Sequence, residues 1–314
     1  MQSLWAGQGQ LMRLKLEGLD GTTTQSVVVK HIVYASSDSH PRGWNSQGSA
    51  QRKRHSYAVE LHWYRDYVAS LNASVKMPEL RYFEESAQSI VLVLEDLAVD
   101  FPVRFTLGKD DRPSPVQIES CIGWLAKLHA RTLECRAEGL WPIGGYWHLD
   151  TRPDEWLAMP ESTLKNSAKQ LDQTLRNCGY QCLMHGDAKL ANFCFDDKGQ
   201  SVAAVDFQYV GRGVGVQDLM LLLSSVLPDA QLLAQGSKWV DVYFEQLTAA
   251  LLQWQPNIKP DEVIKQWRAL YPITWADFHR FLAGWSPDHW KIGKYCIQQT
   301  EQALRMCHSD QHVS

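Results

Sequence analysis

The chain has 314 residues and a formal net charge of −4, from 31 Lys and Arg against 35 Asp and Glu. This balance provides no overall positive field, so neither nucleic acid nor an anionic membrane surface is an expected partner. A hydrophobic fraction of 45% and a charged fraction of 21% are typical of a folded globular protein and exclude a disordered chain. The length predicts about two lobes or domains.

The cysteines and the N-terminal stretch bear on the cellular compartment, and both favour the cytoplasm. Seven cysteines are an odd number at irregular spacings, which favours free thiols in a reducing environment. The N-terminal stretch lacks the basic start and continuous apolar run of a signal peptide, and no run approaches the roughly 20 apolar residues that span a bilayer. We therefore expect a cytoplasmic protein without a membrane partner. The sequence predicts no particular oligomeric state.

The first third of the chain is rich in β-forming residues. "QLMRLKLEG" and "QSVVVKHIVY" are joined by "LDGTTT", which suits a tight turn, so we expect a hairpin over residues 10–34. The polar stretch 38–54 is expected to be a loop, and its basic end "RKRH" a solvated helix start and not a nucleic-acid patch. From His55 onward, apolar residues recur at helical spacing, namely Tyr57, Leu61, Tyr64, Val68 and Leu71. "SIVLVLEDL" at 89–97 predicts a buried strand.

After Leu97 the pattern becomes helical, beginning with "PVQIESCIGWLAKLHARTLE". The exception is "NFCFDDKGQSVAAVDFQ" at 192–208, where "DDKG" joins two short apolar runs and predicts a hairpin. Strands thus concentrate before residue 97 and helices after it. This distribution predicts an α+β fold of two lobes, in which an antiparallel sheet with a helix precedes a mainly helical lobe.

Polar residues stand among apolar ones in "LMHGDAKLANFCF" and "AAVDFQ". Asp187 and Asn192 are five positions apart on a predicted loop, and the following hairpin allows Asp206 to approach Asn192. Phosphoryl transfer requires positioned oxygens for a metal and a carboxylate that orients the attacking hydroxyl. A hard cation such as Mg²⁺ prefers an all-oxygen shell. The motif therefore predicts a phosphoryl-transfer site; the alternative is that these residues only cap turns.

"HGDAKLAN" and "VDFQ" resemble the catalytic loop and metal-binding motif of kinase-like small-molecule phosphotransferases. This group includes aminoglycoside phosphotransferases, choline and ethanolamine kinases and, as the most similar, ecdysteroid-kinase-like proteins. The resemblance implies a two-lobed protein-kinase-like fold and the use of ATP and Mg²⁺. It also implies that Asp187 is the catalytic base, that Lys189 contacts the transferred phosphate, and that Asn192 and Asp206 bind magnesium.

The same resemblance assigns residues 1–95 to a nucleotide-binding N-lobe and 96–314 to a catalytic and substrate-binding C-lobe. Lys30 shares a strand face with apolar residues, and a buried Lys needs an anion. Glu60 lies beside the apolar stripe of the predicted helix and is the expected partner. The resemblance implies that Lys30 also contacts the nucleotide phosphates; the alternative for a lone strand Lys is a surface position.

Two further segments complete the predicted nucleotide site. "VLVLEDL" resembles the hinge between kinase lobes, where the Glu95 carbonyl and the Leu97 N–H would hold the adenine edge; the alternative is a strand end with two exposed acids. "WAGQGQLMRLKL" offers Gly7 and Gly9 before a strand, where a glycine-rich phosphate lid is expected. This stretch lacks the third glycine of a G-x-G-x-x-G pattern.

The helical half is expected to hold the acceptor. Asp218 in "GVQDLMLLL" follows Asp206 by only twelve positions, which leaves no room for a protein-kinase activation segment and favours small-molecule substrates. Asp218 is expected as a helix N-cap that also braces the catalytic loop. Among the thirteen tryptophans, those in "PITWADFHRFLAGWSPDHW" either line a pocket for an apolar or cationic alcohol or pack helices together. Asp277 is expected to be a surface acid, or alternatively the anion for a cationic substrate.

These features predict an enzyme that moves the γ-phosphoryl group of ATP to a hydroxyl of a small molecule. One alternative is a catalytically inactive nucleotide-binding relative. Another is a metal-dependent hydrolase built on His185 and the two Asp, which would bind a transition metal through His185.

Overall fold

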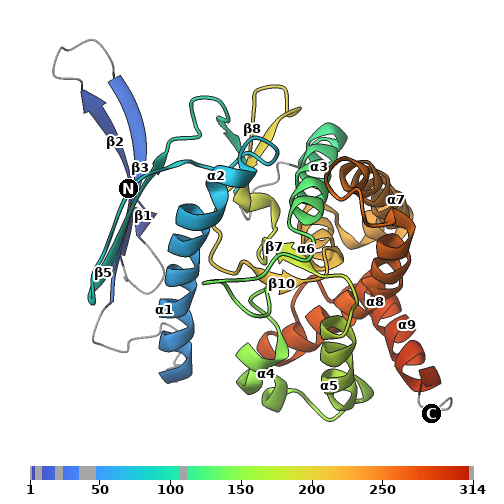
Figure 1. Cartoon of the computed structure of the whole chain (residues 1–314). Coiled ribbons are helices and arrows are strands. Elements are labelled where there is room, and N and C mark those ends of the chain that lie inside the picture. Colours follow the sequence, from blue (N-terminus) through green and yellow to red (C-terminus); the bar gives the residue numbers. More distant parts are fainter. Residues whose placement is uncertain (1, 4–8, 18–23, 35–46, 107–111, 311–314) are drawn as a thin grey trace.

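The computed structural model describes residues 2–3, 9–17, 24–34, 47–106 and 112–310. Within these ranges an antiparallel sheet and a long helix form one half of the molecule, and helices dominate the other half (Figure 1). The sheet has five strands in the order β1-β2-β3-β5-β4, which are Gln2–Ser3, Gly9–Glu17, Thr24–Val33, Ser89–Glu95 and Leu80–Glu85. The predicted α+β class is confirmed.

The expected hairpin is formed by β2 and β3, which pair from Gly9 opposite Ile32 to Glu17 opposite Thr24. Beside this sheet runs α1 (Gln47–His62), which continues through a π-helical turn (Trp63–Tyr67) into α2 (Val68–Leu71). All five residues of the predicted apolar stripe are buried in the core, together with sheet residues such as Leu92. The expectation of a loop up to residue 54 was wrong for 47–54, because the polar segment already forms the first turns of α1.

The helical half begins with α3, which Ser114 caps through a reciprocal side-chain and backbone exchange with Gln117. Its helices are α3 (Pro115–Arg131), α4 (Pro153–Ala158), α5 (Thr163–Arg176), α6 (Val216–Val226), α7 (Asp229–Trp254), α8 (Pro260–Trp285) and α9 (Lys294–Asp310).

Two small sheets lie inside the helical half and position the polar motif. β7 (Cys182–Met184) pairs with β10 (Gly211–Gly213). β8 (Phe193–Phe195) pairs with β9 (Val202–Ala204), as the predicted hairpin requires, and β6 (Val103–Arg104) joins β8 on its other edge.

The sheet-bearing half is joined to the helical half at the Lys76 carbonyl. This oxygen accepts hydrogen bonds from the Trp124 indole (2.9 Å) and from the Ala204 N–H (3.1 Å). One buried hydrophobic cluster runs from the sheet through α3 to α9. The two halves therefore share a core.

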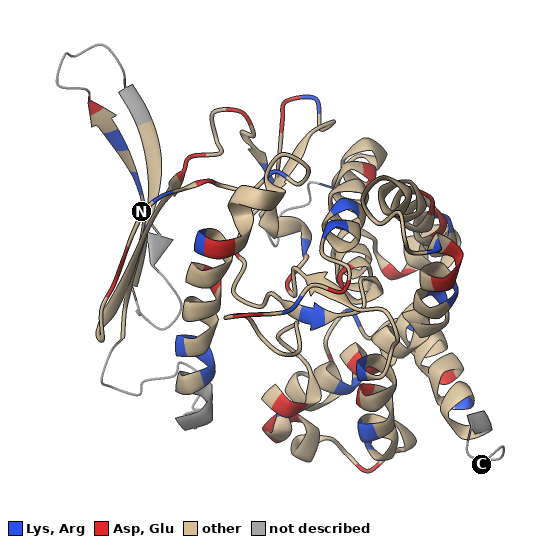
Figure 2. Cartoon of the chain, viewed as in Figure 1, with Lys and Arg blue, Asp and Glu red and all other residues tan. Residues whose placement is uncertain are grey.

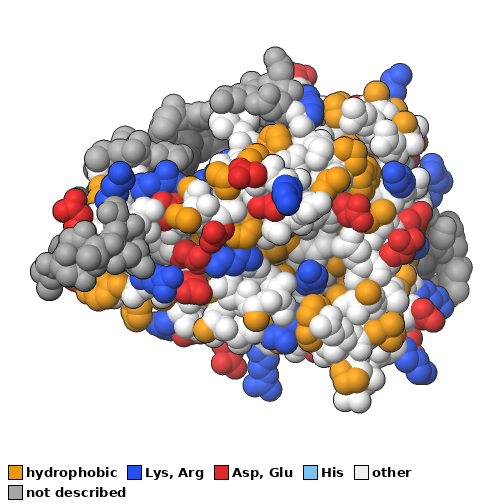
Figure 3. All heavy atoms as spheres, turned by 90° about the horizontal axis from the view of Figure 1, so that it is seen from above, with side chains coloured by type: hydrophobic (Ala, Val, Ile, Leu, Met, Phe, Trp, Pro, Cys, Tyr) orange, Lys and Arg blue, Asp and Glu red, His pale blue; other side chains and the backbone are white. Residues whose placement is uncertain are grey.

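Charges are dispersed over both halves, and acidic and basic side chains intermix on the face seen in Figure 3 (Figures 2 and 3). All seven cysteines are free thiols, as expected. None of the described helices combines the length and apolar character needed to cross a bilayer.

Candidate active site

The catalytic loop begins where β7 ends and runs through "HGDAKLAN" to a 3-10 turn at Leu190–Asn192. Gly186 has a φ of +77°, and a Cβ there would collide with the Tyr209 carbonyl and the Gly145 nitrogen. Only glycine adopts this conformation at so close a backbone approach without strain. The local geometry therefore requires a glycine at position 186.

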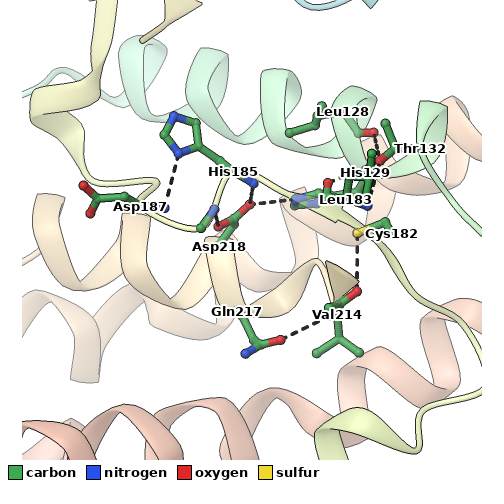
Figure 4. A network of polar contacts seen from close by, with 12 residues as sticks. Leu128, His129, Thr132, Cys182, Leu183, His185, Asp187, Val214, Gln217 and Asp218 are labelled. Atoms are coloured by element: carbon green, nitrogen blue, oxygen red, sulfur yellow. Dashed lines mark hydrogen bonds and ion pairs between the residues drawn. The ribbon is translucent and has the colours of Figure 1, made fainter. Parts of the chain in front are cut away.

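Asp218 fixes the start of this loop (Figure 4). Its carboxylate accepts hydrogen bonds from the backbone N–H groups of His185 (2.6 Å) and Gly186 (2.9 Å), and the His129 ring lies 3.2 Å away. The expected bracing contact is thus present. The expected N-cap was wrong: Gly215 occupies that position, and Asp218 is the third residue of α6, where its carboxylate faces the loop.

Asp187 is buried, and its carboxylate points away from the Asp218 network (Figure 4). Its Oδ2 accepts from Lys189 Nζ (2.7 Å) and Asn192 Nδ2 (3.1 Å). Its Oδ1 is buried without a hydrogen-bond partner among the described residues. A buried oxygen without a hydrogen bond destabilises the fold. The hydroxyl of an acceptor molecule would donate the missing hydrogen bond. Burial raises the pKa of Asp187, while the charge of Lys189 opposes this shift.

Asp206 lies two residues after β9, the second strand of the β8–β9 hairpin. The Val205 N–H donates to the Asn192 carbonyl (2.9 Å), which brings the two proposed magnesium ligands to neighbouring positions. Asp206 has a φ of +70°, a strained value of the kind that clusters at functional sites. Burial opposes its charge, but Lys30, Lys53 and Lys189 together lower its pKa. A low pKa keeps Asp206 ionised, as a Mg²⁺ ligand must be.

Lys30 on β3 and Glu60 on α1 form a buried ion pair with a Nζ–Oε2 distance of 2.7 Å. Burial alone would lower the pKa of Lys30, but the charges of Glu60 and Asp206 raise it above its ordinary value. The expected contact is therefore present, and Lys30 also lies within electrostatic range of Asp206. This arrangement connects the sheet-bearing half with the metal-binding motif.

At the proposed hinge, the side chain of Glu95 pairs with Lys76 (2.8 Å) and accepts from the Glu79 N–H. Asp96 is buried and pairs with Arg13 of β2 (2.7 Å). The alternative of two exposed acids was therefore wrong. Leu97 is buried in a small hydrophobic cluster with Cys194 of β8 and Ala203 of β9. This cluster is separate from the main core.

Of the two proposed lid glycines, Gly7 lies outside the described residues. Gly9 starts β2 opposite Ile32, with a φ of +136°, and a Cβ there would collide with the His31 carbonyl. The strand pairing accounts for a glycine at this position. A contact with phosphates therefore stays a prediction.

Lys53 is a site residue that the sequence analysis missed, because "RKRH" was interpreted as a solvated helix end. Its Nζ donates to Gln208 Oε1 (2.7 Å) and lies 4.6 Å from the centroid of the Tyr57 ring. Gln208 in turn donates to Asp206 (2.7 Å). Burial lowers the pKa of Lys53 to about 8, with the charge of Asp206 opposing. Its spacing from Glu60, seven residues or about two helical turns, was a signal that could have revealed it.

Two of the tryptophans proposed for the pocket, Trp275 and Trp285, lie on α8, whereas Trp290 lies in the connection to α9. Trp275 is buried against Tyr295 and serves packing, whereas Trp285 and Trp290 are exposed. Both expectations for Asp277 were wrong: it is buried and paired with Arg280 at 2.9 Å. The i, i+3 spacing on one helix allows this pairing.

His185 is fully buried, and both of its ring nitrogens contact backbone groups. Nδ1 accepts from the Asp187 N–H (3.2 Å), and Nε2 lies 3.1 Å from the Val205 carbonyl. A transition metal bound through His185 would have to break one of these contacts. The hydrolase alternative therefore finds no support in the geometry of His185.

These groups together define a phosphoryl-transfer class of site. They are a buried carboxylate with an unpaired oxygen, an adjacent Lys, an Asn–Asp pair and a buried Lys–Glu pair. A model of the Phosphotransferase enzyme family matches residues 20–254. The chain belongs to this family. None of the curated proteins matches it.

The chain is also similar to solved structures. An ethanolamine kinase from Plasmodium vivax is 11% identical with a TM-score of 0.47, and the match covers 98% of this chain and 83% of that one. A choline kinase from Cryptosporidium parvum is 12% identical with a TM-score of 0.46, covering 98% and 92%. An aminoglycoside-3'-phosphotransferase of type VIII is 16% identical with a TM-score of 0.37, covering 85% and 94%.

Proposed function

We propose that the protein transfers the γ-phosphoryl group of ATP, with Mg²⁺, to a hydroxyl group of a small molecule. The observation that carries this proposal is the buried Asp187 carboxylate, whose Oδ1 lacks a partner among the described residues while Lys189 and Asn192 hold Oδ2. The family match supports a phosphotransferase in general.

In the proposed reaction, Asp187 orients the acceptor hydroxyl and takes its proton. The hydroxyl oxygen bonds to the γ-phosphorus, the bond from this phosphorus to the β-phosphate oxygen breaks, and ADP leaves. Lys189, Lys30 and Lys53 neutralise the charge on the transferred group and the phosphates.

Asn192 and Asp206 would hold Mg²⁺, because carboxylate and amide oxygens are ligands that it accepts. When bound, Mg²⁺ neutralises charge on the β- and γ-phosphates. The Glu95 carbonyl and the Leu97 N–H would bind the adenine edge. We further propose residues 1–95 and 96–314 as the two lobes.

The test of this function is ATP-dependent phosphorylation of a panel of alcohols by the wild type and by Asp187→Asn. Removing a general base typically costs 10²–10⁴-fold in rate, so kcat should fall by about that factor while ATP binding persists. The matched control is Asp197→Asn on the exposed turn of the β8–β9 hairpin, which should retain full activity. Equal turnover in wild type and Asp187→Asn would refute the mechanism, and ATP binding without turnover would favour the inactive relative.

A further inference from the structure

Lys291 and the rings of Phe278 and Trp290 form a basic and aromatic lining at the connection between α8 and α9. Lys291, between α8 and α9, donates to Ser224 Oγ (3.0 Å) and lies 5.5 Å from the centroid of the Phe278 ring and 5.6 Å from that of Trp290. No carboxylate lies within ion-pair distance of Lys291 in the part of the chain that the structure describes. Burial lowers the pKa of Lys291 to about 8, and the opposing charge is that of Asp187. The residue after Ser224 is Ser225, whose hydroxyl accepts a hydrogen bond from the Leu190 N–H of the catalytic loop (2.9 Å). Lys291 is thus a cation without a carboxylate partner, bound to the helix that holds the catalytic loop.

Arg152 is a second partly buried cation of the helical half. Arg152 lies over the Phe281 ring at 5.4 Å, donates to the Tyr146 carbonyl (2.6 Å) and contacts Glu155 (3.2 Å). Arg52 of α1 donates to the Thr151 carbonyl (2.6 Å), and its pKa is lowered by burial and by the charge of Arg152. The two guanidinium groups therefore lie close enough to repel each other.

Tyr146 and Tyr209 connect these cations to the proposed base. Burial raises the pKa of Tyr146, and the charges of Asp187 and Arg152 both act on it. Burial raises the pKa of Tyr209 to about 12, and the same two charges act on it as well. The two rings have centroids 5.7 Å apart, and both phenol groups lie within electrostatic range of Asp187 and Arg152.

Few negative charges face this lining. Asp277 is turned inward and neutralised by Arg280, and Glu155 is buried against Arg152. A cationic alcohol would be repelled by Lys291, whereas Glu155, Asp277 and Asp187 are each already paired with a cation. An anionic group would meet Lys291, and the partial burial of this cation strengthens the attraction.

We propose that the acceptor alcohol carries an anionic group, a carboxylate or a phosphate ester, that Lys291 binds beside the Phe278 ring. This inference rests on the proposed function. The anionic group does not react: the hydroxyl oxygen attacks the γ-phosphorus, its proton passes to Asp187, and ADP leaves as before. Lys291 acts by positioning the acceptor.

Matched acceptor pairs test the inference: hydroxycarboxylic acids against their amides, and sugar phosphates against the free sugars, with amino alcohols as a third arm. We expect an acidic member to have the highest kcat/KM, and the carboxylate and phosphate arms to show which anion is preferred. Lys291→Met should raise KM for that acid by about 10- to 100-fold, corresponding to the 1.5–3 kcal/mol of a charged hydrogen bond. KM for ATP and for the neutral partner should stay unchanged, and Lys291→Arg should restore part of the effect. Lys294→Met, exposed at the start of α9, is the matched control.

Three results would overturn the inference. Amino alcohols or neutral alcohols could be the better substrates. Lys291→Met could leave KM for the acid unchanged in a variant whose Tm is that of the wild type. Lys291→Met could also lower kcat equally for acids and amides, which would assign Lys291 to the transferred phosphoryl group. If no alcohol of any class is phosphorylated, the proposed function itself fails.

Discussion

The ion pair between Lys30 and Glu60 is a residue-scale feature with a calculable cost. Both groups are buried and joined at 2.7 Å. Removing one partner of a buried pair leaves an uncompensated charge, which typically destabilises by 3–5 kcal/mol, whereas replacing both is often nearly neutral. We expect Lys30→Met to lower the free energy of unfolding by about this amount, and Lys30→Met with Glu60→Leu to recover most of it.

Urea unfolding measures the stability arm of this prediction, and KM for ATP measures the functional arm. The double variant should be stable and yet bind ATP poorly, because it lacks the cation for the phosphates. The exposed pair Arg268–Asp241 on the surface is the matched control, since such pairs contribute about 0–1 kcal/mol. A stable double variant with wild-type KM for ATP would contradict the proposed role of Lys30.

Lys53 illustrates a conflict between stability and function at a single residue. Burial lowers its pKa to about 8, below the ordinary value of 10.5. The unfolded state therefore binds more protons between pH 8 and 10.5, so the stability of the wild type rises with pH across this window. We expect Lys53→Met to be more stable than the wild type at pH 7. At 1.36 kcal/mol per pKa unit, the difference is at most about 3 kcal/mol. The stability of the variant should not rise between pH 8 and 10.5.

The same variant should lose activity. With one cation fewer beside Asp206, kcat/KM should fall by about 10-fold or more, since charged contacts typically contribute 1.5–3 kcal/mol. Denaturant unfolding from pH 7 to 10 and steady-state kinetics measure the two effects. Lys127→Met on the exposed face of α3 should change neither. A destabilised variant with unchanged kinetics would show that Lys53 serves only the packing of α1.

At the scale of elements, Asp218 joins α6 to the catalytic loop and to α3. Asp218→Asn keeps one accepting oxygen but presents an NH₂ group to one of the two backbone N–H donors. We expect kcat to fall by about 10- to 100-fold with KM for ATP nearly unchanged, together with a lower Tm. Thermal unfolding and kinetics check this, with the exposed Asp241→Asn on α7 as control. Unchanged kcat at a lowered Tm would limit Asp218 to a structural role.

Elements with strong local patterns were predictable from the sequence. The stripe from Tyr57 to Leu71 and the β2–β3 hairpin carry their own periodicity, and the turn "DDKG" marks the β8–β9 hairpin. The predicted hairpin also indicated correctly that Asp206 approaches Asn192. The start of α1 was missed because residues 47–54 are polar, and polarity alone resembles a loop.

The tertiary environment of single charges was not predictable in the same way. Lys53 reaches Gln208 across 155 positions, and Lys291 reaches Ser224 across 67. No periodicity encodes such contacts, because they depend on how α1 and the α8–α9 connection pack against the catalytic loop. Asp277 shows the converse: Arg280 was visible three residues away, but burial of the pair depends on the position of α8 within the bundle.

At the scale of the whole molecule, the proposed nucleotide site depends on both halves. Lys30 and Glu60 come from the sheet-bearing half, whereas Asn192 and Asp206 come from the helical half, and Lys30 acts electrostatically on Asp206. A triphosphate with Mg²⁺ would contact both halves at once. A ligand that binds only the folded state stabilises it by about 2.7 kcal/mol at 100 times its Kd.

We therefore expect ATP with Mg²⁺ to raise Tm by several degrees, and EDTA to remove most of this shift together with all turnover. Asp206→Asn should reproduce the effect of EDTA, because it removes the charged metal ligand while retaining the side-chain shape. Asp197→Asn on the exposed hairpin turn should respond as the wild type does. Thermal unfolding with ATP, with and without EDTA, measures these shifts. Equal stabilisation by ATP under all conditions would place the nucleotide away from Asp206 and contradict a metal-bridged site between the two halves.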